Sequence, residues 1–472
     1  MSGAADGAWA PERRLLTVGL IGLVTAAAFE GMAVPTILPA LVADLGGLDL
    51  YGWAFSAFWL TNIIGITLGG SDADRSGPAR ALAVGVVLFA IGLVVAGFAQ
   101  NMPMVIAGRA IQGLGSGAMG AVVYAAIARA YPSSVTPRMI ALVSSAWVVP
   151  GLIGPALAGA VTDALDWRWV FLGIVPPVLI MGLAVYPQLA RLGPAVRASA
   201  AGRSDTRRAF DALRLAVGST LLLGGLTIGD LPVVALFVAG GAWLAIGALR
   251  HLLPVGTLRL APGRPAAVAA AFGIAFAFFG TEAFVPLSVV DVRGGSVTLG
   301  GVALSAAAVT WAAGSWLQDR AASAGIRRAL VTSGAGLIGA GIVVTATVLL
   351  PDVPVLVAAV GWAVAGLGMG LAYSMLALVM LETAAPGEEG FSSAALQLMF
   401  TLGTAFGAGF GGAIVALGSP IALAPAIGVV FGLMLVMALL TVGVSLRVPR
   451  GPSDVRAGVS RPVPSGVPLE HP

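Results

Sequence analysis

The sequence predicts an all-α polytopic membrane protein of fourteen transmembrane helices, with two six-helix bundles and two extra helices inserted between them. Three observations support this prediction. Of the 472 residues, 58% are hydrophobic and 10% are charged, whereas an ordinary soluble domain is about half apolar and about a quarter charged. The apolar residues gather in separate runs along the whole chain. The first six and the last six of these runs resemble each other in sequence.

The composition also excludes several classes of function. A soluble multidomain enzyme does not fit this excess of apolar residues. The net charge is only +4 and comes from arginine, with no lysine, so we expect no nucleic-acid partner. The chain has no cysteine and two histidines, His251 and His471. Cysteine chemistry is therefore excluded, and a histidine metal cluster is nearly excluded.

Each apolar run is long enough, or nearly so, to cross a membrane, which takes about 20 residues. The first six runs cover residues 15–39, 52–71, 79–99, 103–128, 139–161 and 167–190. Two shorter runs, 212–229 and 232–249, meet in a tight turn at Gly229-Asp230-Leu231-Pro232. The last six cover residues 265–290, 297–318, 328–350, 354–381, 391–416 and 421–446. The first run follows Arg13 and Arg14 and is too long for a signal peptide, so it is interpreted as an uncleaved span.

The runs divide the chain into four segments. Residues 1–190 form an N-terminal six-helix half, and residues 265–446 form a C-terminal one. Between them, residues 191–264 are a cytoplasmic linker that contains the two inserted helices. Residues 447–472 are rich in proline and arginine and lack an apolar period, which predicts a disordered cytoplasmic tail.

The placement of arginine predicts the orientation in the membrane. With the N-terminus inside, all but three of the 25 arginines lie in cytoplasmic segments or at their margins. The exceptions are Arg109 within a span and Arg168 and Arg293 outside. We therefore expect a multi-pass protein of the plasma membrane with both termini in the cytoplasm.

An internal repeat relates the two halves. Gly108-Arg109-Ala-Ile-Gln-Gly113-Leu-Gly-Ser-Gly117 matches Gly361-Trp362-Ala-Val-Ala-Gly366-Leu-Gly-Met-Gly370 at the glycines, one alanine and the leucine. At nearly the same separation, Glu30 corresponds to Glu282. An even number of spans lies between the copies, so the halves have the same orientation. Parallel halves of this kind are a transporter architecture, with the binding site at their interface near mid-membrane.

Four motifs in order resemble those of the major facilitator superfamily, and more narrowly its fourteen-span drug:proton antiporters. They are Gly70-Ser-Asp-Ala-Asp74-Arg75-Ser-Gly77-Pro-Ala-Arg80, Arg109-Ala-Ile-Gln112-Gly113, Pro150-Gly-Leu-Ile-Gly154-Pro155-Ala-Leu-Ala-Gly159 and Trp167-Arg168-Trp169-Val-Phe171. The third motif departs from the pattern at Pro150 and Ala158, where glycines are usual. The resemblance implies the major-facilitator fold, a small-molecule substrate, a lipid bilayer around a monomer, no cofactor, and a proton gradient as energy source.

Three charged residues inside spans are candidates for proton coupling. Glu30 and Glu282 lie within apolar runs, where a charge costs roughly 2.5–3.5 kcal/mol on insertion scales. Low dielectric favours the neutral carboxyl, so either acid is suited to load and release a proton. Arg109 lies at a similar depth to Glu30, and we expect it to contact Glu30 or backbone carbonyls. For the acids, the alternatives are a packing hydrogen bond or a place in a water-filled vestibule without a coupling role. For the arginine, the alternative is a structural role.

Aromatic and polar residues in other spans are candidates for a substrate cavity suited to lipophilic or cationic compounds through cation–π contact. The predicted lining residues are Phe58, Trp59, Asn62, Gln112, Phe279 and Trp311. The alternative is that the aromatic residues anchor at the membrane interface or face lipid.

Two further groups are candidates for conformational roles. Charged residues at the cytoplasmic helix ends are expected to latch the two halves together. The predicted latch residues are Asp74, Arg75, Arg80, Asp319 and Arg320. The alternative is that they only reflect the ordinary positive-inside topology. Small residues are expected to let spans approach and pivot. The predicted packing residues are Gly151, Gly154, Pro155, Gly159, Gly407 and Gly411. The alternative is chance, because a chain with 66 glycines has many small helix faces.

The sequence thus predicts a proton-coupled secondary transporter that exports lipophilic or cationic small molecules. One alternative is an exporter of a single metabolite, lipid or antibiotic. An alternative of another class is a membrane sensor or channel. The soluble segments are too short for an output domain or a separate catalytic domain, and paired halves favour alternating access over a channel.

Overall fold

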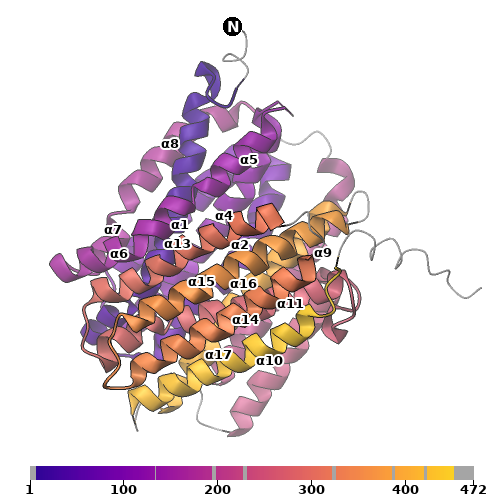
Figure 1. Cartoon of the computed structure of the whole chain (residues 1–472). Coiled ribbons are helices and arrows are strands. Elements are labelled where there is room, and N and C mark those ends of the chain that lie inside the picture. Colours follow the sequence, from indigo (N-terminus) through magenta and orange to yellow (C-terminus); the bar gives the residue numbers. More distant parts are fainter. Residues whose placement is uncertain are drawn as a thin grey trace, which may run out of the picture.

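The computed structural model describes residues 7–132, 134–193, 198–226, 231–321, 326–384, 388–418 and 422–450. The regular elements within these ranges are helices, and most lie side by side in one bundle (Figure 1). Thirteen helical stretches among the described residues are long and apolar enough to cross a membrane. The predicted tail lies largely outside the described residues.

The first half contains six membrane spans. Its helices are α1 (Pro11–Leu45), α2 (Tyr51–Ser76), α3 (Pro78–Gly97), α4 (Met102–Ala130), α5 (Thr136–Ser145), α6 (Val148–Ala164), α7 (Arg168–Leu172) and α8 (Val175–Ala190). A short 3-10 turn, η1 (Leu48–Leu50), precedes α2. Gly77 makes the sharp turn from α2 to α3 at φ 91°, a conformation that glycine adopts without steric cost.

Two of the predicted spans in this half are interrupted helices. A proline has no N–H to donate to the carbonyl four residues before it. Pro150 therefore leaves the carbonyl of Ala146 without its helical donor, at the junction of α5 and α6. Pro176 does the same to Leu172, where α7 ends before α8. Pro155 instead lies inside the continuous helix α6.

The inserted segment forms a helical hairpin of α9 (Ala198–Gly225) and α10 (Leu231–Leu252). Helix α9 begins within the predicted cytoplasmic linker, ahead of the apolar run that starts at residue 212. It is not one of the thirteen apolar helices. Arg208, Asp211 and Arg214 fall in its middle, which leaves only residues 215–225 without charge before its end. The fourteenth span is therefore not confirmed, and the predicted turn at 229–232 is largely outside the described residues.

The second half also contains six membrane spans. Its helices are α11 (Arg264–Glu282), α12 (Val285–Leu287), α13 (Val297–Ala321), α14 (Arg327–Ala346), α15 (Val357–Glu382), α16 (Glu389–Gly418) and α17 (Leu423–Ser445). Short turns accompany them: η2 (Thr257–Arg259), η3 (Ser288–Val292), which is a π-helix, and η5 (Thr347–Leu349). Together α11, α12 and η3 make one span, Arg264–Val292.

The two halves repeat the same contact between corresponding helices. In the first half, Thr61 of α2 donates its hydroxyl to the carbonyl of Ala110 in α4 at 2.8 Å. In the second half, Thr310 of α13 donates to the carbonyl of Ala363 in α15 at 2.6 Å. The matching glycines Gly113 and Gly366 lie directly against these threonines, where a Cβ would collide. These paired contacts give the internal repeat a structural basis, while the exact segment boundaries stay predictions.

The two halves meet at one end of the bundle, which we call the closed end. There α6 packs on α13 and α2 packs on α16. Gly52 lies against Gly412, and Ser56 donates its hydroxyl to the carbonyl of Ala405 at 2.7 Å. Tyr51 also crosses between halves, donating its hydroxyl to the carbonyl of Ala283 at 2.8 Å.

Three ion pairs among the described residues of the opposite end each join two residues of the same half. Arg80 lies 3.8 Å from Asp72 in the first half. Arg264 pairs with Glu388 at 3.0 Å in the second half. The second half also holds a bidentate pair between Arg327 and Glu382. The cross-half hydrogen bonds of Tyr51 and Ser56 are therefore concentrated toward the closed end.

Candidate proton-coupling and substrate site

The first acid belongs to a buried cluster that joins three helices. Arg109 of α4 forms an ion pair with Glu30 of α1, and both side chains are essentially without solvent exposure. The same nitrogen, Nη1, donates to Oε1 of Gln112 at 2.6 Å, and Nε donates to the carbonyl of Ala54 in α2 at 3.1 Å. The guanidinium also lies 4.4 Å from the ring centre of Phe58. The charge on Glu30 therefore has a counter-ion in place.

The cluster leaves two polar atoms without a partner among the described residues: Oε2 of Glu30 and Nε2 of Gln112. One is an acceptor and the other a donor, and both are buried. Groups of this kind are commonly satisfied by a buried water.

The second acid has a different environment. Glu282, at the end of α11, lies beside the indole of Trp362 in α15. Phe278, one turn earlier, stacks on the same indole with ring centres 4.6 Å apart. Trp362 occupies the repeat position of Arg109. Among the described residues Glu282 forms no ion pair, and an indole stands at the repeat position where the first half has a guanidinium.

Aromatic side chains from both halves form one cluster. Trp59 of the first half lies 6.4 Å, between ring centres, from Phe279 of the second. Phe279 is in turn 6.2 Å from Trp311 and 5.5 Å from Phe400, and Tyr373 completes the group at 4.4 Å from Phe400. We call these five residues the aromatic cluster. Trp59, Phe279 and Trp311 are half-buried, as a lining position requires.

The other three predicted cavity residues lie deeper in the first half. Phe58 packs beneath Arg109, and Gln112 binds the same guanidinium. Asn62 is buried, with its amide nitrogen 3.5 Å from the carbonyl of Gly113. These residues support the acid cluster and the α2–α4 contact. A direct role in substrate binding stays a prediction for them.

Sequence reasoning missed three aromatic residues of this region. The internal repeat contains a signal for Trp362. This residue stands at the repeat position of Arg109, which places it near the second acid. Tyr373 and Phe400 had none, because they come together only when α15 and α16 pack. Their contact depends on tertiary structure rather than on local pattern.

The predicted latch residues lie at the end opposite the closed end. Asp74, Arg75 and Arg80 are exposed. It is Asp72, rather than Asp74, that pairs with Arg80, and Ser76 bridges the two by hydrogen bonds of 3.0 and 3.2 Å. Asp319 and Arg320 belong to α13, but their side chains lie outside the described residues. A latch across the halves stays a prediction.

The predicted packing residues of α6 contact the other half. Gly151 lies near Ala308, and the carbonyl of Pro155 lies against Gly301. A Cβ on Gly159 would come within 2.6 Å of Cα of Thr298. By contrast, Gly154 faces a ring of its own half, Phe29, and in α16 Gly407 and Gly411 face Gly280 and Phe284. Small residues thus permit the close α6–α13 approach, while pivoting there is not tested.

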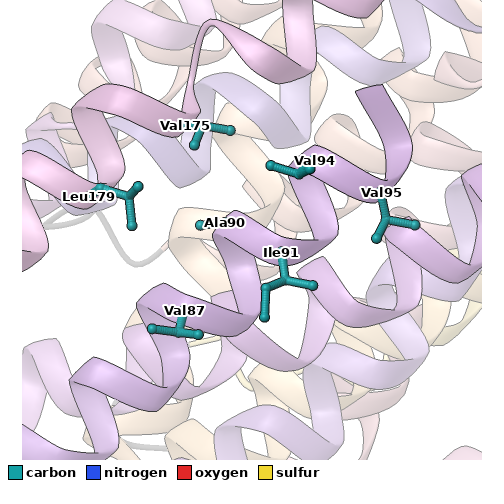
Figure 2. Close-up of a pocket in the computed structure, with 7 residues that line it drawn as sticks. All are labelled: Val87, Ala90, Ile91, Val94, Val95, Val175 and Leu179. Carbon is teal, nitrogen blue, oxygen red and sulfur yellow. The ribbon is translucent and has the colours of Figure 1, made fainter. Parts of the chain in front are cut away.

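A groove on the outer surface is separate from this region. Figure 2 shows it between α3 and α8, lined by Val87, Ala90, Ile91, Val94, Val95, Val175 and Leu179. All seven side chains are aliphatic. The groove includes none of the candidate site residues, and its apolar surface suits contact with lipid.

The fold and the buried acids define a helical membrane protein with two similar halves around a shared interface. The family model of the Major Facilitator Superfamily matches residues 19–395. The chain therefore belongs to the Major Facilitator Superfamily.

Relatives agree with this assignment. An uncharacterized MFS-type transporter of Mycobacterium tuberculosis is 28% identical over 86% of this chain, which spans only 60% of that relative's length. The multidrug transporter protein MdtP of Bacillus subtilis is 27% identical, covering 85% of this chain and 75% of its own. A bacterial homologue of the human lysosomal transporter Spinster, in an inward-facing and occupied conformation, shares the fold with a TM-score of 0.66 at 14% identity, covering 92% of this chain and 96% of its own.

Proposed function

We propose that the chain is a proton-coupled exporter of lipophilic or cationic small molecules that works by alternating access in the plasma membrane. The proposal rests on one observation: each half holds an acid within a membrane helix, and a series of side-chain contacts links each acid to the aromatic cluster. Phe58, under Arg109, touches Trp59, with ring centres 5.2 Å apart. Phe278, beside Trp362, touches Phe279 at the same separation. The name of MdtP, a multidrug transporter protein, adds support.

The closed end is proposed to face the outside. The opposite end, with Arg80, Arg264 and Arg327, then faces the cytoplasm, as the positive-inside rule favours. Substrate would approach from the cytoplasm and lie against the aromatic cluster. Rocking of the two halves would then open the closed end and release it outside.

Proton coupling is assigned to the two acids. A carboxylate within a membrane helix is costly, so a proton from the outside is favoured to neutralise it when the closed end opens. Protonation of Glu30 would weaken its ion pair with Arg109. Protonation of Glu282 would remove a negative charge that has no cation beside it among the described residues. Either event would favour return to the cytoplasm-facing form.

Proteoliposomes test this proposal directly. A fluorescent lipophilic cation is offered under an imposed pH gradient to the wild type and to Glu30→Gln and Glu282→Gln. We expect gradient-driven transport in the wild type and loss of the gradient dependence in at least one variant. Asp352→Asn, which changes an exposed acid at the closed end, should behave as the wild type.

The same assay separates broad from narrow specificity. Competition between structurally unrelated compounds would support multidrug export. Gradient dependence that survives in both acid variants would contradict the assignment of the carriers. If none of the lipophilic cations tried is transported, export of one specific compound would be favoured instead.

A further inference from the structure

The two halves share a helix cap at the closed end. Asp163, near the end of α6 in the first half, accepts hydrogen bonds from three groups at the start of α13 in the second half. These are the backbone N–H of Val297 at 3.3 Å, the N–H of Thr298 at 2.9 Å and the hydroxyl of Thr298 at 2.6 Å. The carboxylate of one half therefore satisfies donors of the other.

The first turn of α13 divides its donors between two caps. The first N–H groups of a helix have no partner within the helix. Ser296, from the same half, accepts from the N–H of Leu299 at 3.1 Å. Asp163 takes the N–H groups of Val297 and Thr298. When the halves separate at this end, these two donors lose their protein acceptor.

Helices α6 and α13 approach closely enough for this contact because a glycine lies between them. Gly159 precedes Asp163 by one helical turn and faces the same partner, where a side chain would collide with Val297 and Thr298. Asp163 itself is exposed, so water can replace the contact when the halves part. The contact is therefore both close and reversible.

The charges nearby do not compete for Asp163. Arg168 at the same end is engaged with Asp44 at 2.9 Å and with Asp166 at 3.5 Å. Arg293 donates to the carbonyls of Val348, Leu350 and Pro351. The negative carboxylate also lies at the positive end of the α13 dipole, which favours it.

We propose that Asp163 is a conformational latch, a helix cap supplied across the halves that holds the closed end shut. Its loss shifts the molecule toward the form that is open at this end. The latch requires alternating access only. It depends neither on the identity of the substrate nor on which acid carries the proton.

Spin-label distances measured without substrate or gradient test the latch. The chain has no cysteine, so Phe98→Cys and Leu350→Cys, both exposed at the closed end of different halves, give one labelled pair. The background is otherwise wild type in lipid nanodiscs. Asp163→Ala should raise the ratio of open to closed populations about five-fold, the effect of losing a typical N-cap. Asp163→Asn should stay close to the wild type, because asparagine caps a helix as well as aspartate does.

Two further variants keep the test decisive. Thr298→Ala removes only the hydrogen bond from the Thr298 hydroxyl, so it should raise the ratio of open to closed populations by less than Asp163→Ala does. This variant still tests the proposal if the Asp163→Ala protein does not fold. Asp352→Ala changes an acid at the same end and should leave the ratio unchanged. An unchanged ratio in Asp163→Ala and Thr298→Ala would overturn the proposal. So would an Asp163→Asn protein as open as Asp163→Ala.

Discussion

At the scale of single residues, the two acids differ in what can compensate their charge. Glu30 lies against Arg109, whereas Glu282 lies beside Trp362. A buried ion pair is costly to form but more costly to break, because the remaining partner is left as an uncompensated charge. The first half therefore depends on Arg109 for stability, in addition to any role in coupling.

Replacing Arg109 should expose this dependence. Arg109→Met leaves Glu30 buried without a counter-ion, and we expect a loss of about 3–5 kcal/mol of stability. The double variant Glu30→Gln/Arg109→Met should recover much of the loss, since no buried charge remains. Thermal unfolding in detergent measures both. Equal stability of the single and double variants would show that the pair does not compensate charge.

The aromatic cluster gives a prediction about binding. Phe279 touches Trp59, Trp311 and Phe400, so Phe279→Ala should raise the KM for a lipophilic cation about five- to thirty-fold, the value of one desolvated cation–π contact. Phe98→Ala removes an exposed ring at the end of α3 and is the matched control. Transport kinetics of the two variants and the wild type check this prediction. A Phe279→Ala protein with the KM of the wild type would argue against the cluster as a binding surface.

At the residue scale, the sequence predicts contacts best for charged residues whose depth in the membrane is known. An arginine and a glutamate at similar depth in the first and fourth spans each needed a partner, and they contact each other. Depth says nothing about which way an aromatic side chain points. Phe58 and Trp59 are neighbours in sequence, yet the first lies under Arg109 and the second faces the other half.

At the scale of elements, the α9–α10 hairpin contacts both halves. Leu223 of α9 lies in a small cluster with Leu60 of α2 and Ala405 of α16. The two hairpin helices cross closely at Gly218 and Gly241. The hairpin therefore covers the seam between α2 and α16, where the halves meet.

Adjacent glycines in α10 test the importance of this crossing. A Cβ on Gly241 would lie 2.6 Å from the backbone nitrogen of Leu222, whereas one on Gly240 would meet nothing within 4 Å. Gly241→Ala should lower stability by about 1–3 kcal/mol through overpacking, and Gly240→Ala should not. Thermal unfolding of the pair gives the comparison. Similar effects of the two substitutions would mean that the crossing is not a tight contact.

Element boundaries were predictable only where composition changes sharply. The apolar runs located the spans of both halves, but periodicity did not reveal the breaks at Ala146 and Leu172, which follow from prolines four residues downstream. In α9, helix formation extends through charged residues that the pattern assigned to a linker. Apolar length predicts a membrane span, whereas helix length depends on capping and packing as well.

At the scale of the whole molecule, the halves touch at the closed end through Ser56 and Ala405, Gly52 and Gly412, and Asp163. The internal repeat predicted two similar bundles, and Thr61 and Thr310 make equivalent contacts in them. The sequence could not predict at which end the halves meet. Under the proposed alternating access, that choice is a balance between two conformations of one chain and depends on contacts across the interface.

The central claim is that transport requires the closed end to open. Ser56→Cys/Ala405→Cys places one thiol on α2 and one on α16, at two residues that the hydrogen bond from the Ser56 hydroxyl to the Ala405 carbonyl, 2.7 Å long, already joins. The chain has no other cysteine. Transport in proteoliposomes is measured before oxidation, after cross-linking by a disulfide or a short thiol-reactive linker, and, for the disulfide, after reduction. We predict that cross-linking abolishes transport and that reduction restores it. Full transport by protein shown to be cross-linked would contradict the account.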